Sequence, residues 1–257
     1  MSVPGAPVRW RTVWITGASS GIGRAVALRL AASGARVAAS ARTEAGLAAL
    51  AAENSAVAAF PLDVVEPGPV ADTVERIERE LGGIDLAILA AGTWTQVKPA
   101  RAFDPEVFRR AMEVNYLGTV NALAALVPRM VARGGGHIAI VASVAGYRGL
   151  PRAAAYGPSK AALINLAESI RPELEARGVR ISVINPGFVR TPMTDVNRFP
   201  MPFLMEPDEA ARRIVAGLAA GRYEIAFPTR FVAVMKLLRA LPDAAFFWVV
   251  RTLMMRK

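Results

Sequence analysis

The chain has 257 residues, of which 53% are hydrophobic and none is cysteine, so it can bury a large core but can form no disulfide and carry out no thiol chemistry. Its net charge is +10, yet the 31 basic residues are spread along the whole sequence without an aromatic-interleaved stripe, which disfavours a nucleic-acid binder. No apolar run of about 18 residues occurs, and residues 1–11 show no signal-peptide pattern, so we expect a cytoplasmic protein that does not span a membrane.

The first predicted strand and helix flank a glycine-rich turn. Residues 12–16 (TVWIT) form an apolar run typical of a buried strand, and residues 21–32 carry apolar side chains at helical spacing. Glycines between them let the backbone turn tightly and approach a pyrophosphate, which the free N–H groups of the helix N-terminus bind. An ordinary strand-helix turn is the alternative, but the flanking elements favour a nucleotide site at Gly17, Ser19, Ser20, Gly21, Ile22 and Gly23.

The end of the second predicted strand, residues 36–41, indicates which nucleotide binds. Dinucleotide folds that use NAD usually place an acid there for the ribose 2′-hydroxyl, whereas an arginine accommodates the 2′-phosphate of NADP. No acid stands at Ser40 or Ala41, and Arg42 follows directly. We therefore expect NADP(H) to be favoured over NAD(H), unless Arg42 is only one more solvated arginine among many.

The middle of the chain continues the alternation of strands and helices. Residues 56–62 form a strand that ends at Asp63, residues 67–81 a helix, and residues 84–90 a near-continuous apolar strand followed by Gly92. Asp104 caps a long helical stretch with Asn115 in its middle, and residues 136–143 form a fifth strand that ends at Ser143. His137 lies at the opposite end of that strand, so we interpret this single histidine as structural.

A tyrosine and a lysine four residues apart are the candidate catalytic pair. Residues 153–177 form a helix that places Tyr156 and Lys160 on one face. An ammonium beside a phenol stabilises the phenolate and brings its pKa into working range. Ser143, at the end of the preceding strand, could share a carbonyl oxygen with the phenol in acid-base chemistry. The alternative is a surface tyrosine stacked along a lysine stem.

The predicted strands assemble into one domain with a single candidate site. A sixth strand at residues 179–185 is closed by Pro186 and Gly187, and strands alternating with helices indicate right-handed βαβ units in a doubly wound parallel sheet. Ligands bind such sheets beyond the carboxyl ends of the strands. The glycine-rich turn, Arg42, Asp63, Gly92, Ser143 and Pro186 all follow strand ends, so we expect them at one edge.

Together these motifs resemble the short-chain dehydrogenase/reductase family over residues 11–228. The resemblance implies an α/β, Rossmann-type fold with about seven strands. It implies that Tyr156 donates or accepts the proton, Lys160 lowers its pKa and holds the nicotinamide ribose, Ser143 binds the substrate oxygen, and Asn115 opens a helix around a proton-relay water. It implies that Asp63 and Val64 contact the adenine of the cofactor. It also implies contacts of other parts of the cofactor with Ala91, Gly92, Pro186, Gly187, Val189 and Thr191.

One departure from the family pattern stands after the fourth strand. The family commonly has Asn-Asn-Ala-Gly there, whereas this chain has Leu-Ala-Ala-Gly at residues 89–92, so the usual asparagine that braces neighbouring strands is absent. We expect this change to affect stability more than chemistry. Members of the family are commonly dimers or tetramers, which implies a homodimer or homotetramer here.

The last third of the chain carries the substrate lid and a basic tail. We expect a catalytic domain at residues 1–228, with a lid at about 190–207 whose methionines and phenylalanines either suit an apolar, chain-like substrate or pack the lid onto the domain. Residues 229–257 form a C-terminal helical extension with six cations against one acid, in two apolar segments separated by a break and a new N-cap at Pro242-Asp243. This tail either lies on anionic lipid as a peripheral membrane contact, or packs over a neighbouring subunit or its own substrate cleft.

The sequence thus predicts an oxidoreductase that transfers a hydride between NADP(H) and a carbonyl or secondary alcohol of a small apolar molecule, such as a lipid-like, acyl or steroid-like compound. No metal site is expected. The alternative is an NAD(P)(H)-binding regulatory or scaffold protein whose tail binds a membrane or a partner.

Overall fold

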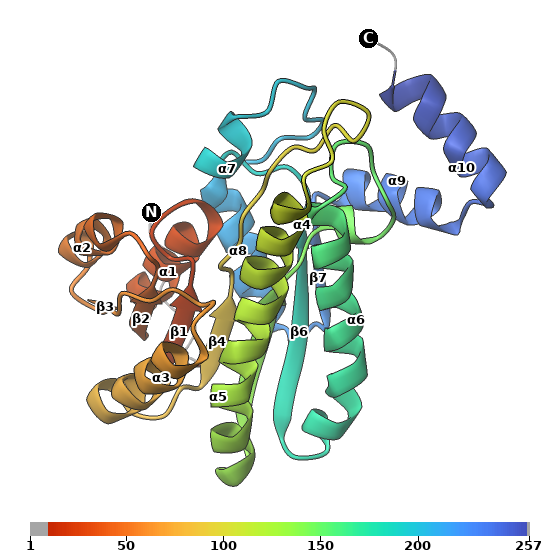
Figure 1. Ribbon diagram of the computed structural model, residues 1–257. Coiled ribbons are helices and arrows are strands. Elements are labelled where there is room, and N and C mark those ends of the chain that lie inside the picture. The colour runs from red at the N-terminus through yellow and green to blue at the C-terminus, as the bar shows by residue number, and fades with distance from the viewer. Residues whose placement is uncertain (1–9, 256–257) are drawn as a thin grey trace, which may run out of the picture.

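The computed structural model of the chain describes residues 10–255 (Figure 1). The segment before Trp10 and two of the predicted tail cations, Arg256 and Lys257, lie outside the described residues. The centre is one seven-stranded sheet in the order β3-β2-β1-β4-β5-β6-β7, with every neighbouring pair parallel. Its strands are β1 (Thr12–Thr16), β2 (Arg36–Ser40), β3 (Val57–Ala59), β4 (Leu86–Leu89), β5 (Gly136–Val141), β6 (Val179–Pro186) and β7 (Glu224–Phe227).

The central strands are apolar because both faces of the sheet are covered. All residues of β1 and β4 are buried, as expected for parallel strands between two helical layers. Helices α3 (Pro67–Leu81), α5 (Gly118–Ala132) and α6 (Tyr156–Glu175) bury their side chains in the core on one face, and α1 (Gly21–Ala32), α2 (Glu44–Glu53) and α8 (Pro207–Ala219) in the core on the other. The strand order reverses between β1 and β4, which opens a crevice at their carboxyl ends.

The predicted fold class is confirmed, with differences at element ends. The third strand is assigned only to Val57–Ala59, which is shorter than the predicted residues 56–62. Phe60 and Leu62 still donate their N–H groups to the carbonyls of Ala39 and Ala41, so the extended pairing with β2 reaches Leu62. The helix predicted over residues 153–177 begins only at Tyr156.

A π-helical turn interrupts the long helical stretch that follows β4. Asp104 caps α4 (Pro105–Met112) by accepting a hydrogen bond from the N–H of Glu106 at 2.9 Å. The turn η1 (Glu113–Leu117) then joins α4 to α5 and contains Asn115. Such single π-turns widen the helix locally and redirect a side chain. Here the widened turn holds Asn115, which is fully buried.

The tail packs back onto its own domain. Helix α9 (Thr229–Ala240) buries Val232, Met235 and Leu238 in the same core cluster as α5 and α6. Helix α10 (Asp243–Val249) and the π-turn η3 (Val250–Met254) continue beyond it and stand to one side of the body (Figure 1). The predicted break is present, but the cap is one residue earlier than Asp243. Pro242 holds the N-cap position, and the Asp243 carboxylate pairs with Arg148 at 2.5 Å.

Within residues 10–255, none of the helices combines the length and the apolarity that a bilayer crossing requires.

Candidate active site

A cleft of about 340 Å³ lies beyond the carboxyl ends of the strands, around the crevice between β1 and β4. It brings together residues that are more than 150 positions apart in the sequence, from Gly17 to Thr194. All of the residues predicted to bind a cofactor line it, namely Gly17, Ser19, Ser20, Gly21, Ile22, Gly23, Arg42, Asp63, Val64, Ala91, Gly92, Tyr156, Lys160, Pro186, Gly187, Val189 and Thr191. Ser143 lines the same cleft, whereas Asn115 is buried behind it.

The glycine-rich turn forms a cradle that a side chain would fill. Gly17 has φ +69°, and a Cβ there would lie 2.8 Å from the carbonyl oxygen of Ala90. A Cβ at Gly23 would lie 2.4 Å from the carbonyl oxygen of Gly17. Ser20, the N-cap of α1, makes no side-chain cap bond, so this helix end keeps N–H groups for an anion. These features fit the diphosphate of a dinucleotide.

Thr16 supplies the brace that the missing asparagine would provide. Its Oγ1 accepts hydrogen bonds from the N–H groups of Ala90 at 3.0 Å and Ala91 at 3.1 Å, and so ties the end of β1 to the segment after β4. The expected loss of bracing is therefore offset by another side chain. Thr16 could have been found from its place as the last residue of β1, because its hydroxyl there faces the neighbouring strand end.

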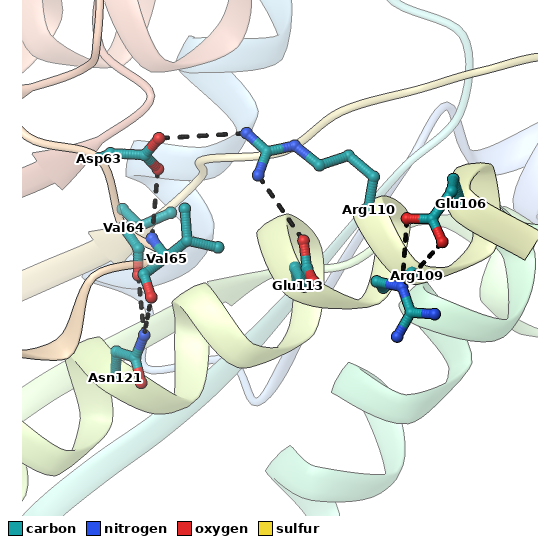
Figure 2. A network of polar contacts seen from close by, with 8 residues as sticks. All are labelled: Asp63, Val64, Val65, Glu106, Arg109, Arg110, Glu113 and Asn121. Atoms are coloured by element: carbon teal, nitrogen blue, oxygen red, sulfur yellow. Dashed lines mark hydrogen bonds and ion pairs between the residues drawn. The ribbon is translucent and has the colours of Figure 1, made fainter.

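The far end of the cleft is held by polar contacts that sequence reasoning missed (Figure 2). The Oδ1 of Asp63 accepts a hydrogen bond from the N–H of Val65 at 3.2 Å. Asn121 on α5 donates to the carbonyls of Val64 at 3.0 Å and Val65 at 3.2 Å, and Arg110 lies 4.0 Å from the Asp63 carboxylate. These contacts hold the Asp63-Val64 turn, the expected adenine site, against the helical layer.

Ser143, Tyr156 and Lys160 meet at the inner end of the cleft. The Lys160 ammonium is buried, donates to the carbonyl of Val141 at 2.8 Å and lies 5.6 Å from the centre of the Tyr156 ring. The Oγ of Ser143 accepts from the N–H of Ala145 at 3.1 Å, which fixes the hydroxyl at the end of β5. Their positions follow from the fold, because β5 ends at the cleft and α6 begins beside it.

Asn115 connects this cluster to the segment after β4. Its Oδ1 accepts from the N–H of Thr93 at 2.7 Å, and its Nδ2 donates to the carbonyl of Thr93 at 3.1 Å and to the Oγ of Ser159 at 2.9 Å. The same Oδ1 would lie 3.2 Å from a Cβ at Gly92. The amide therefore lies directly behind the cleft and orients both the loop after β4 and the first turn of α6.

Burial changes the proton affinities of the pair in opposite directions. Desolvation raises the pKa of Tyr156 to about 12, and a hydrogen bond with Ser143 acts in the opposite direction. Desolvation lowers the pKa of Lys160 to about 7. The tyrosine is therefore protonated through the neutral range, and the lysine titrates there. The contribution of Lys160 to the pKa of Tyr156 stays a prediction.

The buried lysine should make stability depend on pH in the absence of cofactor. Between pH 7 and its ordinary pKa of 10.5, Lys160 keeps its proton in the unfolded chain and has lost it in the folded chain. Unfolding then takes up a proton, so the free energy of unfolding rises with pH. Relative to Lys160→Met, the wild type should gain up to about 1.4 kcal/mol per pH unit over this window. Urea unfolding of both proteins at several pH values checks this, and parallel pH profiles would show that Lys160 titrates normally.

A second, apolar pocket of about 130 Å³ adjoins Ser143 and Tyr156. Trp94 packs edge-on against Tyr156 with ring centres 5.2 Å apart, and its indole N–H donates to Asn197 in the lid at 3.0 Å. The remaining wall comes mainly from Leu150, Pro151, Phe188, Met193, Phe199 and Phe231. The lid side chains Met193 and Phe199 thus face this pocket.

Sequence reasoning missed three aromatic walls of this pocket. Trp94 and Phe188 each follow a predicted strand end by a few residues, which was a usable signal. Phe231 lies on α9 in the tail and stacks on Phe188 with ring centres 5.5 Å apart. No local sequence pattern predicts that the tail folds back onto this pocket. Helix α9 thus packs over the apolar pocket of its own chain through Phe231.

The tail is clamped to the loop between Ser143 and Tyr156. The Arg148 guanidinium donates to the carbonyls of Leu238 at 3.0 Å and Arg239 at 3.1 Å, and stacks 4.0 Å over the ring of Phe246. The neighbouring Tyr147 donates to Glu224 on β7 at 2.5 Å, and Glu224 also pairs with Lys236 of α9. Burial and the Glu224 carboxylate both raise the pKa of the Tyr147 hydroxyl. Two successive side chains of this loop therefore hold α9 in place.

Comparison with known proteins places these features in a family. A family model described as short chain dehydrogenase matches residues 11–200. An uncharacterised oxidoreductase of Myxococcus xanthus is 38% identical over 245 residues, which are 94% of this chain and 96% of that protein. An uncharacterised oxidoreductase of Staphylococcus epidermidis is 32% identical over 83% of this chain and 93% of its own length.

A solved structure has the same architecture along almost the whole chain. It is a short chain dehydrogenase from Burkholderia cenocepacia in complex with NADP, with a TM-score of 0.82 and 29% sequence identity. The alignment covers 96% of this chain and 99% of the other. The similarity therefore includes the tail, beyond the part that the family model matches.

Proposed function

The chain belongs to the short-chain dehydrogenase family and is an NAD(P)-dependent oxidoreductase, and from this premise we propose that it transfers a hydride between NADP(H) and the carbonyl or secondary alcohol of an apolar small molecule. The single observation that carries the proposal is the junction of the two cavities. Ser143 and Tyr156 line both the polar cleft and the apolar pocket, so their hydroxyls stand where a cofactor and a substrate would meet.

We propose that the dinucleotide is held by the glycine cradle, Arg42 and the Asp63-Val64 turn. Its nicotinamide end would lie beside Pro186, Gly187 and Thr191. The nicotinamide supplies or accepts the hydride when it is bound. The protein's contribution is to hold the reacting groups at short range and to stabilise charge on the substrate oxygen.

The proton that accompanies the hydride is assigned to Tyr156. Its hydroxyl is protonated at neutral pH, so it can donate to an oxygen on which negative charge develops. The Ser143 hydroxyl is a second donor to that oxygen. The buried Lys160 binds beside the tyrosine ring and places a titratable amine next to it. Asn115 holds the loop and helix that carry these groups.

The proposed substrate class follows from the second pocket. Its wall is mostly apolar and includes five aromatic residues, and besides Ser143 and Tyr156 its polar side chains are those of Thr194, Asn197 and the Trp94 indole. Such a wall favours an apolar body with one reactive oxygen. A panel of aliphatic, acyl and polycyclic ketones, assayed by loss of NADPH absorbance, tests this class. Higher kcat/KM for polar sugars than for all apolar ketones would contradict it.

The preference for NADP(H) is expected to depend on Arg42. It is exposed at the cleft edge beyond β2, where it can pair with a 2′-phosphate. Because a hydrogen bond to a charged group contributes about 1.5 to 3 kcal/mol, Arg42→Ala should weaken NADPH binding about 10- to 100-fold and leave NADH binding unchanged. Titration followed by nicotinamide fluorescence measures both constants.

Arg177→Ala is the matched control, because this exposed arginine lies at the other end of α6, outside the cleft. Equal affinity of the wild type for both nucleotides would remove the role of Arg42 and leave the family assignment intact. The scaffold alternative is not favoured, since the relatives named above are oxidoreductases. Binding of neither nucleotide would revive it.

We further propose a homodimer or homotetramer, in keeping with the frequency of oligomers in the family. The catalytic unit is proposed to span residues 1–228 with the lid at about 190–207, and residues 229–257 form the extension that closes the substrate pocket through Phe231.

A further inference from the structure

Exposed large apolar side chains are concentrated at one end of the molecule. Within residues 10–255, eleven large hydrophobic residues are exposed, and ten of them lie in three segments: the loop at residues 93–104, residues 192–205 of the lid and the tail at 229–255. We call these ten the apolar rim: Phe103, Met193, Val196, Phe203, Val234, Leu237, Phe247, Trp248, Leu253 and Met255. Only Leu117 lies elsewhere in the described chain. A set this concentrated indicates an interaction surface.

The same three segments wall the apolar pocket. Trp94 comes from the loop, Phe199 from the lid and Phe231 from α9. Phe203 of the rim packs 6.3 Å from Phe231, measured between ring centres, so rim and pocket wall are continuous. In Figure 1 the loop after β4, the lid and the tail all lie at the end of the molecule beyond the strands. The apolar rim and the apolar pocket therefore belong to the same three segments at one end of the molecule.

The tail presents apolar groups on its outer surface. On α9 the exposed Val234 and Leu237 lie three residues apart on the side opposite the buried Val232, Met235 and Leu238. On α10 Phe247 and Trp248 are 54% and 63% exposed, whereas the adjacent Phe246 is buried. Aromatic residues with an apolar body and a polar edge are favoured at the boundary between lipid and water.

Charge decides between the candidate occupants of this surface. The three segments hold seven cations against three carboxylates, and six of the cations form no ion pair with a described residue: Lys98, Arg101, Arg198, Arg230, Arg239 and Arg251. Lys236, the seventh, pairs with Glu224. A second copy of the chain would bring the same excess of cations against itself in a symmetric contact. An anionic bilayer instead attracts these arginines and accepts the apolar side chains.

We propose that the apolar rim docks on the surface of an anionic lipid bilayer, with the opening of the apolar pocket toward the acyl chains. Docking requires no chemistry at the active site, so a test of lipid binding is independent of any test of the proposed reaction. It would let an apolar substrate pass from the membrane into the pocket without crossing water.

Cosedimentation of the full-length protein with lipid vesicles tests the proposal. Binding is expected to vesicles of phosphatidylcholine mixed with phosphatidylglycerol, to weaken as salt is raised and to be weak on pure phosphatidylcholine. Trp248→Gln with Leu253→Gln should reduce partitioning at least about tenfold, since the two side chains lose their contact with lipid. Both are more than half exposed, so the fold should be unaffected. Leu117→Gln, outside the rim, is the control.

The charge contribution has its own matched pair of variants. Replacing Arg230, Arg239 and Arg251 together by Gln should weaken binding about a hundredfold, at about fivefold per cation near the surface. The control replaces Arg79, Arg177 and Arg222 by Gln, which removes the same charge from exposed positions outside the three segments. Equal losses in both triple variants would overturn the proposal. So would a protein that stays in the supernatant, or a homo-oligomer that dissociates on Trp248→Gln without any binding to lipid.

Discussion

Tyr156→Phe is expected to lower kcat about a thousandfold while leaving NADPH affinity unchanged, because general acid-base groups contribute between about a hundred- and ten-thousandfold. The substitution removes one hydroxyl and keeps the ring that packs against Trp94, so the apolar pocket should retain its shape. The buried Lys160 and its hydrogen bond to Val141 should also remain. Steady-state kinetics with an apolar ketone, together with a nucleotide titration, measure the two effects separately.

Tyr223→Phe is the control for this prediction. Tyr223 lines neither cavity, and its hydroxyl has no hydrogen-bond partner among the described residues, so its loss should leave kcat unchanged. Turnover by Tyr156→Phe at the wild-type rate, with normal NADPH binding, would exclude this hydroxyl as the proton donor. Loss of NADPH binding would instead show that the substitution disturbs the cleft.

Gly23→Ala is expected to weaken binding of both nucleotides at least about a hundredfold. A displacement of about 1 Å in a group that positions a ligand has effects of this size. The new Cβ would lie 2.4 Å from the carbonyl oxygen of Gly17 and 2.9 Å from its carbonyl carbon. Both are backbone atoms, so the glycine-rich turn itself must move. Overpacking of this kind also costs about 1 to 3 kcal/mol of stability, which urea unfolding would report.

Gly68→Ala provides the comparison for this second substitution. Gly68 lies in the first turn of α3, and a Cβ there would meet nothing within 4 Å. This variant should bind NADPH like the wild type and be at least as stable, because alanine restricts the unfolded chain more than glycine does. If Gly23→Ala bound both nucleotides normally, the turn would not be the diphosphate site.

Features that depend on local pattern and strand order could be predicted from the sequence. The run TVWIT predicts β1 because a parallel strand that is buried on both faces is apolar throughout. The spacing of apolar residues predicts α1 because a helix buries only one side. The placement of Arg42, Asp63 and Ser143 around one cleft then follows from topology alone, since parallel strands bring their carboxyl ends to the same edge.

Features that depend on chain segments meeting from a distance could not be predicted. Asn121 leaves no local signal of its bonds to Val64 and Val65, because an asparagine on a helix is as often solvated. The same holds for Arg148, one arginine among many in a basic chain, whose partners are carbonyls 90 or more positions away. The difference at the end of β3 is one of definition, since the N–H groups of Phe60 and Leu62 still bond to the β2 segment beyond the last assigned residue, Ala59.

Phe231, which lines the apolar pocket, comes from a different part of the chain than the proposed catalytic residues. The cradle, Tyr156 and Lys160 lie within residues 11–200, the part shared with the family model, whereas Phe231 comes from the tail beyond it. If the apolar pocket holds the substrate as proposed, relatives that share the first 200 residues but differ in the tail are expected to share a reaction and differ in substrate. Exchanging the tail between such relatives, with Arg148 retained as its anchor, offers a way to redirect specificity without altering the chemical machinery.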